Sequence, residues 1–525
     1  MNDKVVNIVG AGLSGLSAAI TLSKLGVSSR LISSMPSERA QSVLAEGGIN
    51  AALDTMGEND SMAEHFADTM KGGCFLESES AVRNLTESAP DIVRELYLLG
   101  TPFNNDNGRI LLRNFGGQKK KRTAFSKSST GKMIMTALID EVRKYEAKGI
   151  VTRYLHHELV GINVSNGQLD SITVLDTHTQ QTYLFYGNTI LCTGGLNGFF
   201  EGATTGTTQN TGNAAALAYK AGVIFADLEF IQYHPTTVGI SGKRMLISEA
   251  ARGEGGRLFT LKDGKPWYFM EEKYPELGNL MPRDVVSREM YFVMHDDKCS
   301  GEVFLDMTSI EDKVWNGKLS DLRREIISYL KKDPKTEPIA VSPGIHFFMG
   351  GISVSDAHET NISGLYAAGE AACKYHGANR LGGNSLLGAI YGGKVAAKTA
   401  SETAAEAAVI ETEERKLSVS SPAVRAQLRD ILLEGLGIVR DNEGIIKMCR
   451  RLEALKMSDD LSSIDRDRIE LGITMGKSAL ARKESRGAHY RIDFPQSSDD
   501  YKKLTIVSES NGNCCVDFIA AEERM

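Results

Sequence analysis

Most of the residues suited to chemistry fall in five short segments where polar side chains lie among glycines. These segments are EFIQYHPT (229–236), MLISEAARGEGG (245–256), MPRDVVSR (281–288), GIHFFMGGI (344–352) and HGANRLGGNSLLGA (376–389). Arg380 offers a forked guanidinium that matches a carboxylate. His234, Ser248 and His346 can add hydrogen bonds to the same anion. Each residue alone is more often an ion pair or a packed side chain, so the prediction of an anion site depends on their occurring together.

These segments need a scaffold, and the N-terminal sequence KVVNIVGAGLSGLSAAITLSKLGVSSRLIS indicates one. It is typical of a buried strand, a glycine-rich turn, a helix that ends at Gly26 and a second strand. Gly10 would allow the tight turn, Gly12 the approach of a pyrophosphate, and Gly15 close packing of helix and strand. The helix N-terminus would face the phosphates. The predicted dinucleotide contacts are Gly10, Gly12, Leu13, Ser14, Gly15 and Ser33.

One part of the dinucleotide pattern is missing. An acidic residue that holds a ribose is expected about 20 residues after the turn. The second strand ends instead in Ser33 and Ser34. A hydroxyl can substitute for the carboxylate, but NAD is disfavoured as the cofactor.

Two further strands stop at glycines, at 184–195 and 361–372, far from the first along the chain. A domain assembled from separate pieces is therefore expected. The segment 226–345, which is rich in charged turns and contains both tryptophans, is expected to be an insertion into this domain. The residues from 402 onward have a helical pattern, and 401–421 are expected to form a helix followed by a polar linker. The predicted boundaries are 1–225 with 346–401, 226–345, and 402–525.

Composition narrows the class of protein. The 525 residues carry a formal net charge of −7, which gives no reason to expect nucleic acid or an anionic membrane as a partner. Apolar runs are too short to cross a bilayer, and the start MNDKVVNIVGAG does not match a signal peptide. The seven cysteines show no metal-ligand spacing. We expect a cytoplasmic enzyme with reduced thiols and no metal.

In their order and spacing, the motifs resemble the flavoprotein of the fumarate reductase and succinate dehydrogenase family, which includes L-aspartate oxidase. The similarity runs from the first strand to ESRGAHYR (484–491). It implies an α/β fold, with a Rossmann-like FAD-binding domain, an inserted α+β capping domain and a C-terminal helical domain.

The resemblance also implies a reaction. Hydride from flavin N5 would reduce the double bond of fumarate or a close unsaturated dicarboxylate, and the binding cations would stabilise the developing charge. The family's proton donor matches Arg283, and its resupply relay matches Glu249 and Arg252. An arginine can serve only with a neighbouring carboxylate and fast reprotonation.

Gln41, in RAQSVLAEGGIN (39–50), departs from the respiratory relatives, which carry there a histidine that joins covalently to FAD. Glutamine cannot form this bond, so the resemblance implies noncovalent FAD and a lower flavin potential. Asn213 also departs, because the family usually has TGDG where this chain has TGN. The resemblance further implies FAD contacts at Ser42, Ala45, Glu46, Gly47, Gly48, Thr193, Gly194, Glu370, Ser385 and Leu386.

The branch of the family and the electron source stay open. RNFGGQKKKRT (113–123) and TGKMIMTAL (130–138) favour a reductase or dehydrogenase over L-aspartate oxidase, which remains the alternative. Another alternative is a flavoprotein subunit of a multi-subunit complex. The sequence has no iron–sulfur ligands, so electrons would come from a soluble reductant or a redox partner.

Overall fold

The computed structural model describes residues 4–412, 420–510 and 513–523. The FAD-binding fold expected from the sequence is built on a five-stranded parallel sheet. The sheet has the order β21-β12-β1-β2-β8. Its strand β1 is buried throughout, as expected for a strand covered on both faces. The three strands expected to stop at glycines, β1, β12 and β21, are neighbours, which confirms assembly from distant pieces. The bounds are β1 (Val5–Val9), β2 (Ser28–Ser33), β8 (Val151–Leu155), β12 (Thr189–Leu191) and β21 (Leu365–Ala367).

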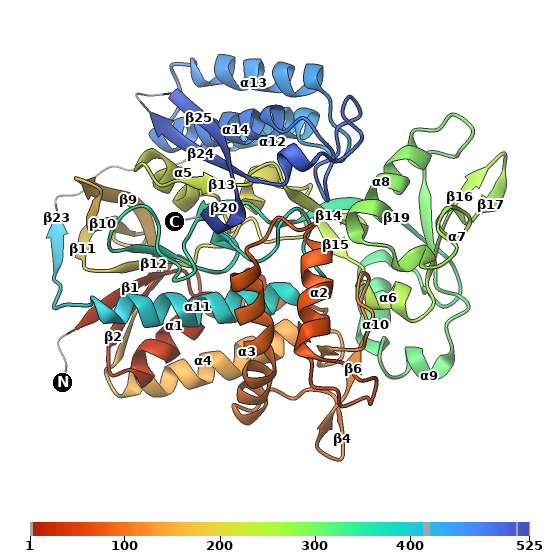
Figure 1. The fold of residues 1–525 in the computed structure, drawn as a ribbon, viewed down its shortest axis with the longest axis horizontal. Coiled ribbons are helices and arrows are strands. Elements are labelled where there is room, and N and C mark those ends of the chain that lie inside the picture. The colour runs from red at the N-terminus through yellow and green to blue at the C-terminus, as the bar shows by residue number, and fades with distance from the viewer. Residues whose placement is uncertain (1–3, 413–419, 511–512, 524–525) are drawn as a thin grey trace.

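Helices pack closely around this sheet. The predicted strand–turn–helix–strand unit is confirmed, with α1 between β1 and β2. Helix α1 packs along α11, which runs through the middle of the molecule in Figure 1. A Cβ at Gly393 of α11 would lie 2.3 Å from the carbonyl oxygen of Ser14, so this helix pair requires glycine. The bounds are α1 (Leu13–Lys24), α2 (Met62–Gly72), α3 (Glu79–Leu98), α4 (Thr130–Ala147) and α11 (Asn384–Glu402).

An antiparallel sheet, with the order β23-β11-β10-β9, corrects two expectations. The strand expected at 184–195 is broken at Gly187, whose φ of 102° turns the chain between β11 and β12. The prediction of a helix in 401–421 is wrong beyond Glu402, where α11 ends, because residues 409–412 form a strand that pairs with β11. The linker residues 413–419 lie outside the described residues. The bounds are β9 (His157–Ser165), β10 (Gln168–Asp176), β11 (Thr182–Tyr186) and β23 (Val409–Thr412).

A six-stranded sheet with the order β15-β14-β19-β18-β16-β17 builds the cap, drawn in green at the right of Figure 1. Its own apolar core includes Trp315, Phe269 and Leu322, all nearly inaccessible to solvent. The cap is α+β, as predicted. Its strands are β14 (Ile231–Ile240), β15 (Lys243–Leu246), β16 (Arg257–Lys262), β17 (Lys265–Trp267), β18 (Val303–Asp306) and β19 (Ile339–Phe348), and its helices are α6 (Ala250–Gly253), α7 (Phe269–Lys273), α8 (Arg283–Met294), α9 (Asp312–Trp315) and α10 (Ser320–Leu330).

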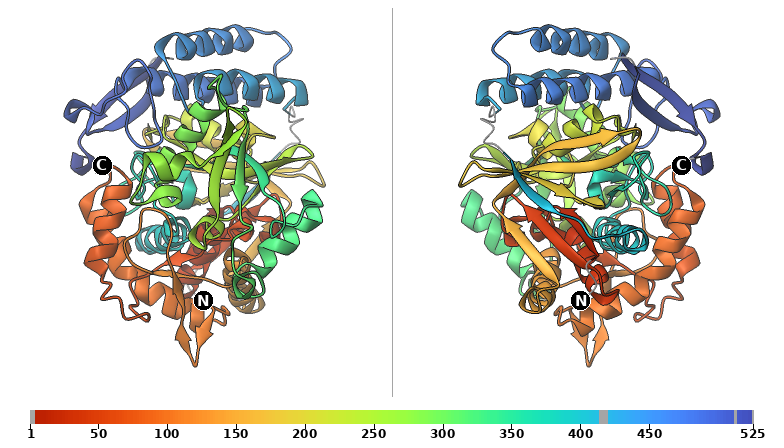
Figure 2. Two further views of the ribbon diagram at one scale, coloured as in Figure 1. Left: turned by 90° about the vertical axis from the view of Figure 1, so that its right-hand side faces the viewer. Right: turned by 90° about the vertical axis from the view of Figure 1, so that its left-hand side faces the viewer.

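Three C-terminal helices form a layer at one end of the molecule (Figures 1 and 2). They confirm the helical prediction for this part of the chain, but the chain then forms a hairpin that extends a mixed sheet, β22-β20-β13-β24-β25. Arg482 fixes this region, because its buried guanidinium contacts Glu229 at 2.6 Å and Glu484 at 2.9 Å. The bounds are α12 (Pro422–Gly435), α13 (Asn442–Lys456), α14 (Ser463–Ala481), β13 (Phe225–Ala226), β20 (Gly351–Ser353), β22 (Ala372–Cys373), β24 (Leu504–Ser510) and β25 (Asn513–Ile519).

Among the described residues, no helix is long and apolar enough to cross a membrane, and no cluster of histidine, cysteine or acidic residues could hold a metal ion.

One further helix and several short strands complete the described part of the structure. The remaining bounds are α5 (Asn213–Lys220), β3 (Ile49–Asn50), β4 (Asn105–Asp106), β5 (Arg109–Ile110), β6 (Leu112–Arg113) and β7 (Thr123–Ala124).

Candidate active site

A cavity of about 1150 Å³ lies between the carboxyl ends of the parallel strands and the cap. Crevices at this edge of a parallel sheet are where α/β proteins bind ligands. Its walls come from both domains: the turns after β1, β2 and β12, the loop 40–48, the cap strands β14 and β19, and the segment 368–389.

The glycine-rich turn has the geometry that a dinucleotide requires. Gly10 has a φ of 107°, and a Cβ there would lie 2.2 Å from the carbonyl oxygen of Cys192. At Gly15 a Cβ would lie 1.9 Å from the carbonyl oxygen of Gly10, so strand and helix could not pack. Gly12 differs, because the nearest protein atom to its Cβ position is Ser42 Oγ at 3.5 Å. The space beside Gly12 is therefore open to a pyrophosphate at the N-terminus of α1.

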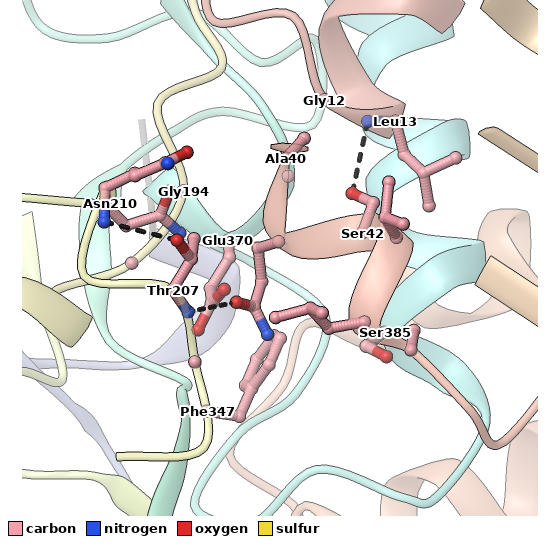
Figure 3. Close-up of a pocket in the computed structure, with 18 of the residues that line it drawn as sticks. Gly12, Leu13, Ala40, Ser42, Gly194, Thr207, Asn210, Phe347, Glu370 and Ser385 are labelled. Carbon is pink, nitrogen blue, oxygen red and sulfur yellow. Dashed lines mark hydrogen bonds between the residues drawn. The ribbon is translucent and has the colours of Figure 1, made fainter. Parts of the chain in front are cut away.

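The loop after β2 lies beside this turn and also lines the cavity. Ser42, in a short 3-10 helix (Gln41–Leu44), accepts a hydrogen bond from the Leu13 N–H at 3.3 Å (Figure 3). The Gln41 side-chain oxygen accepts a hydrogen bond from the Thr207 N–H. On the facing wall, Figure 3 places Thr207 with Gly194 and Asn210. The neutral Gln41 amide is thus tied to backbone at a wall of the cavity.

Glu370 lies in the cavity wall beside Phe348, whose backbone N–H donates to its carboxylate at 3.0 Å. Burial raises the pKa of Glu370 to about 7, although the Phe348 N–H and the charge of Arg380 oppose this shift. The side chain can therefore change protonation state near neutral pH.

The predicted cofactor residues gather around one cavity with a single exception. Gly15 lies behind the wall, where it serves helix packing. The residues that line the cavity are Gly10, Gly12, Leu13, Ser14, Ser33, Ser42, Ala45, Glu46, Gly47, Gly48, Thr193, Gly194, Glu370, Ser385 and Leu386.

Arg283, at the start of α8, lines the part of the cavity nearest the cap. Its Nε and Nη2 donate to Glu249 Oε2 at 2.9 and 2.7 Å. The other oxygen of Glu249 lies 3.4 Å from Arg252 Nη2. Arg252 lies behind Glu249 and does not line the cavity. The three predicted residues therefore form a chain that leads from the protein interior to the cavity.

The charges within this chain are strongly coupled. Burial alone would raise the pKa of Glu249, but the charges of Arg283 and Arg252 hold that pKa below its ordinary value. Burial lowers the pKa of Arg252. Glu249 is thus ionised and both guanidiniums share its charge.

Arg380 faces the same cavity, and no carboxylate in the described part of the chain forms an ion pair with it. Its Nη1 donates to the carbonyl oxygen of Leu381 at 3.2 Å, and its guanidinium lies 4.6 Å from the ring centroid of Phe347. Its Nε has no hydrogen-bond partner among the described residues. Burial and the charge of Arg283 lower the pKa of Arg380 well below its ordinary value. This buried cation, which has no ion-pair partner among the described residues, is suited to binding an anion.

Two histidines complete this part of the cavity with Ser248. The ring centroids of His234 and His346 lie 5.2 Å apart, and His346 Nδ1 lies 2.8 Å from the Thr205 hydroxyl. Burial and the charge of Arg283 lower both histidine pKa values well below the ordinary range. At neutral pH these rings therefore act as uncharged hydrogen-bonding groups. The four residues predicted for substrate binding, His234, Ser248, His346 and Arg380, all line the cavity.

Gln232 was missed by the sequence analysis. Its side-chain oxygen accepts from Arg283 Nη1 at 3.2 Å, and its amide donates to Asn379 Oδ1 and to the carbonyl oxygen of Arg380, each at 2.8 Å. Asn379 in turn donates to Asp284 Oδ1 at 2.9 Å. These buried bonds connect the cap arginine to the Arg380 segment. The only sequence signal for Gln232 and Asn379 was that they lie in EFIQYHPT and HGANRLGG, close to the predicted substrate-binding residues His234 and Arg380.

Comparison with known proteins identifies the family. A family model described as FAD binding domain matches residues 5–386. A second model, described as fumarate reductase flavoprotein C-term, matches residues 465–522. The chain belongs to the family of succinate dehydrogenase and fumarate reductase flavoproteins and is a flavin-dependent oxidoreductase with an FAD-binding domain. The resemblance inferred from the motifs is confirmed.

Individual relatives span the branches of this family. The succinate dehydrogenase flavoprotein subunit of Bacillus subtilis is 36% identical over 95% of this chain and 93% of its own. L-Aspartate oxidase of Pyrococcus furiosus is 34% identical, covering 96% of this chain and 99% of its own. Among solved structures, the FrdA chain of E. coli quinol fumarate reductase has a TM-score of 0.84 and 28% identity, over 98% and 96% of the two chains.

Glu370 provides a test of the cavity's electrostatics in the apoprotein. Its pKa of about 7 exceeds that of an unfolded glutamate, about 4.3. Between these values the folded state holds a proton that the unfolded chain has lost, so stability falls as pH rises and then levels off. We expect the wild type to lose about 3 kcal/mol relative to Glu370→Gln across this range, measured by urea unfolding at a series of pH values.

The exposed Glu411, on β23, supplies the control for this comparison. Glu411→Gln should leave the pH dependence of unfolding unchanged. Parallel stability curves for the wild type and Glu370→Gln would contradict a raised pKa at Glu370.

Proposed function

We propose that the protein reduces the double bond of fumarate, or of a close unsaturated dicarboxylate, to the saturated acid. The observation that carries this proposal is the disposition of Arg283 and Arg380 on one cavity, with Arg283 backed by Glu249 and Arg252. One arginine lacks a carboxylate and can bind the substrate. The other belongs to a chain of groups that can resupply a proton.

Substrate binding uses the surplus of positive charge. Arg380 takes one carboxylate through its free N–H groups, while the neutral His234, His346 and Ser248 supply hydrogen bonds. Fixed donors of this kind stabilise charge that develops beside a carboxylate during reduction.

Proton delivery falls to Arg283. FAD, held along Gly12, the loop 40–48 and Glu370, supplies the hydride from its reduced flavin ring when bound. Arg283 gives its proton to the adjacent carbon and recovers one through Glu249, which Arg252 keeps charged and in place. An arginine is a weak acid, so this role depends on the carboxylate at 2.7 Å and on the burial of both side chains.

Oxidation of L-aspartate is the second candidate, supported by the 34% identical relative that bears that name. An ammonium group is best held by a free carboxylate. At the cap end of the cavity Glu249 is already shared by Arg283 and Arg252. This sharing favours a simple dicarboxylate as substrate.

Electrons must reach the flavin from outside the chain. The Bacillus subtilis relative is named as a subunit, which favours a redox partner protein as the donor. A soluble reductant is the alternative. We retain a cytoplasmic location and the domain boundaries given above as parts of the proposal.

Noncovalent attachment of FAD is a further part of the proposal. Gln41 has no nucleophilic nitrogen and its oxygen is bonded to the Thr207 N–H. We expect acid precipitation of the purified protein to give a colourless pellet, with FAD released into the supernatant and measured by absorbance. A yellow pellet would show a covalent bond and would remove the argument that a low flavin potential favours fumarate reduction.

The main test is an anaerobic assay of fumarate reduction with a reduced viologen dye. We expect turnover by the wild type, and a decrease in kcat of about 100- to 10,000-fold in Arg283→Ala, because a proton donor is lost. Arg288→Ala, on the same helix but bound to Tyr490 by a cation–π contact, should keep kcat within about twofold.

Two results would contradict the proposal. Unchanged turnover in Arg283→Ala would exclude this residue as the proton donor. Release of peroxide from L-aspartate in air, without any fumarate reduction, would instead assign the protein to the L-aspartate oxidase branch.

A further inference from the structure

We propose that Glu158 binds the 2′-hydroxyl of the adenosine ribose of FAD, with Asn213 holding its carboxylate in place. The dinucleotide pattern expects an acidic residue for this purpose at the end of the second strand. This chain has Ser33 and Ser34 there. The inference depends on FAD binding by this domain and not on the proposed fumarate reduction.

The topology brings Glu158 to the same place as the missing acid. Strand β8 pairs with β2, and Leu155 lies opposite Ser33 at the carboxyl ends of both strands. Glu158 follows three residues later, at the start of β9, and lines the cavity together with Ser33 and Ser34. A carboxylate on the neighbouring segment thus reaches the edge where the ribose is expected.

The Glu158 carboxylate is held in position but retains bonding capacity. Asn213 Nδ2 donates to Glu158 Oε1 at 3.1 Å. Within the described chain the Glu158 carboxylate has no ion pair and no hydrogen bond other than this one. Asn213 is the first residue of α5, so the N-terminus of this helix also favours a negative charge there. The second oxygen, Oε2, remains available to a ligand hydroxyl.

Two unsatisfied polar atoms nearby point to a ligand. Ser33 Oγ is buried and has no hydrogen-bond partner among the residues that the structure describes, and the same is true of Asn213 Oδ1. Buried polar groups without partners are costly, so native structures usually satisfy them with protein, water or ligand. A ribose carries two adjacent hydroxyls, each of which can donate and accept. Ser33, Asn213 and Glu158 all line the cavity, so a sugar bound there would bring such hydroxyls beside all three residues.

Asn213 also explains the departure from the family pattern. A carboxylate at position 213 would lie beside that of Glu158, and like charges at hydrogen-bonding distance repel. The amide donates to Glu158 instead. The negative charge is therefore carried by β9 rather than by α5.

The test compares FAD with its analogue that contains 2′-deoxyadenosine, using apoprotein from riboflavin-starved cells. We expect the wild type to bind FAD about 10- to 100-fold more tightly than the analogue, because a charge-assisted hydrogen bond is lost. In Glu158→Gln, FAD binding should weaken by a similar factor and the preference for FAD should largely disappear. Dissociation constants come from quenching of flavin fluorescence.

Asp170→Asn is the matched control, since this exposed carboxylate lies on the adjacent strand β10. It removes the same charge from the same sheet and should leave both affinities unchanged. Wild-type FAD affinity in Glu158→Gln would overturn the proposal. Weaker binding with the preference for FAD retained would also overturn it, because Glu158 would then only anchor α5.

Discussion

A surplus of buried positive charge is the constraint on which this site depends. Arg252 and Arg283 share one carboxylate, that of Glu249, while Arg380 has none within ion-pairing distance in the described chain. Burying an unpaired charge is costly, and the repulsion between the like charges of Arg283 and Arg380 adds to this cost. A ligand with two carboxylates would relieve both terms, which supports the proposal of a small dicarboxylate substrate.

The fold can keep these two positive charges close together because the two arginines come from different domains. Arg283 belongs to the cap, whereas Arg380 follows the parallel sheet. Gln232 bonds to both segments, and Asn379 adds a bond to the cap through Asp284. Satisfied polar networks of this kind fix geometry more than they add stability. The contacts that hold the cap against the Arg380 segment are thus the same contacts that orient the charges.

The sequence predicted features that a local pattern determines. The glycine turn, α1 and the C-terminal helices follow from spacing that one segment contains. Features set by distant partners were missed: 409–412 become a strand because β11 offers an edge, and Gly187 redirects a run of apolar residues. The roles of Gln232 and Glu158 were missed for the same reason, since the role of an amide or a carboxylate depends on the distant residues that it contacts.

The most direct measurement is the affinity of the FAD-loaded protein for malonate, an unreactive dicarboxylate, followed by the change in flavin absorption. If the surplus charge drives binding, malonate should bind the wild type and Arg380→Gln should weaken it by about 30-fold or more, since a buried charge pair is lost. Arg288→Gln should have no effect. Equal affinity in the wild type and Arg380→Gln would contradict the account.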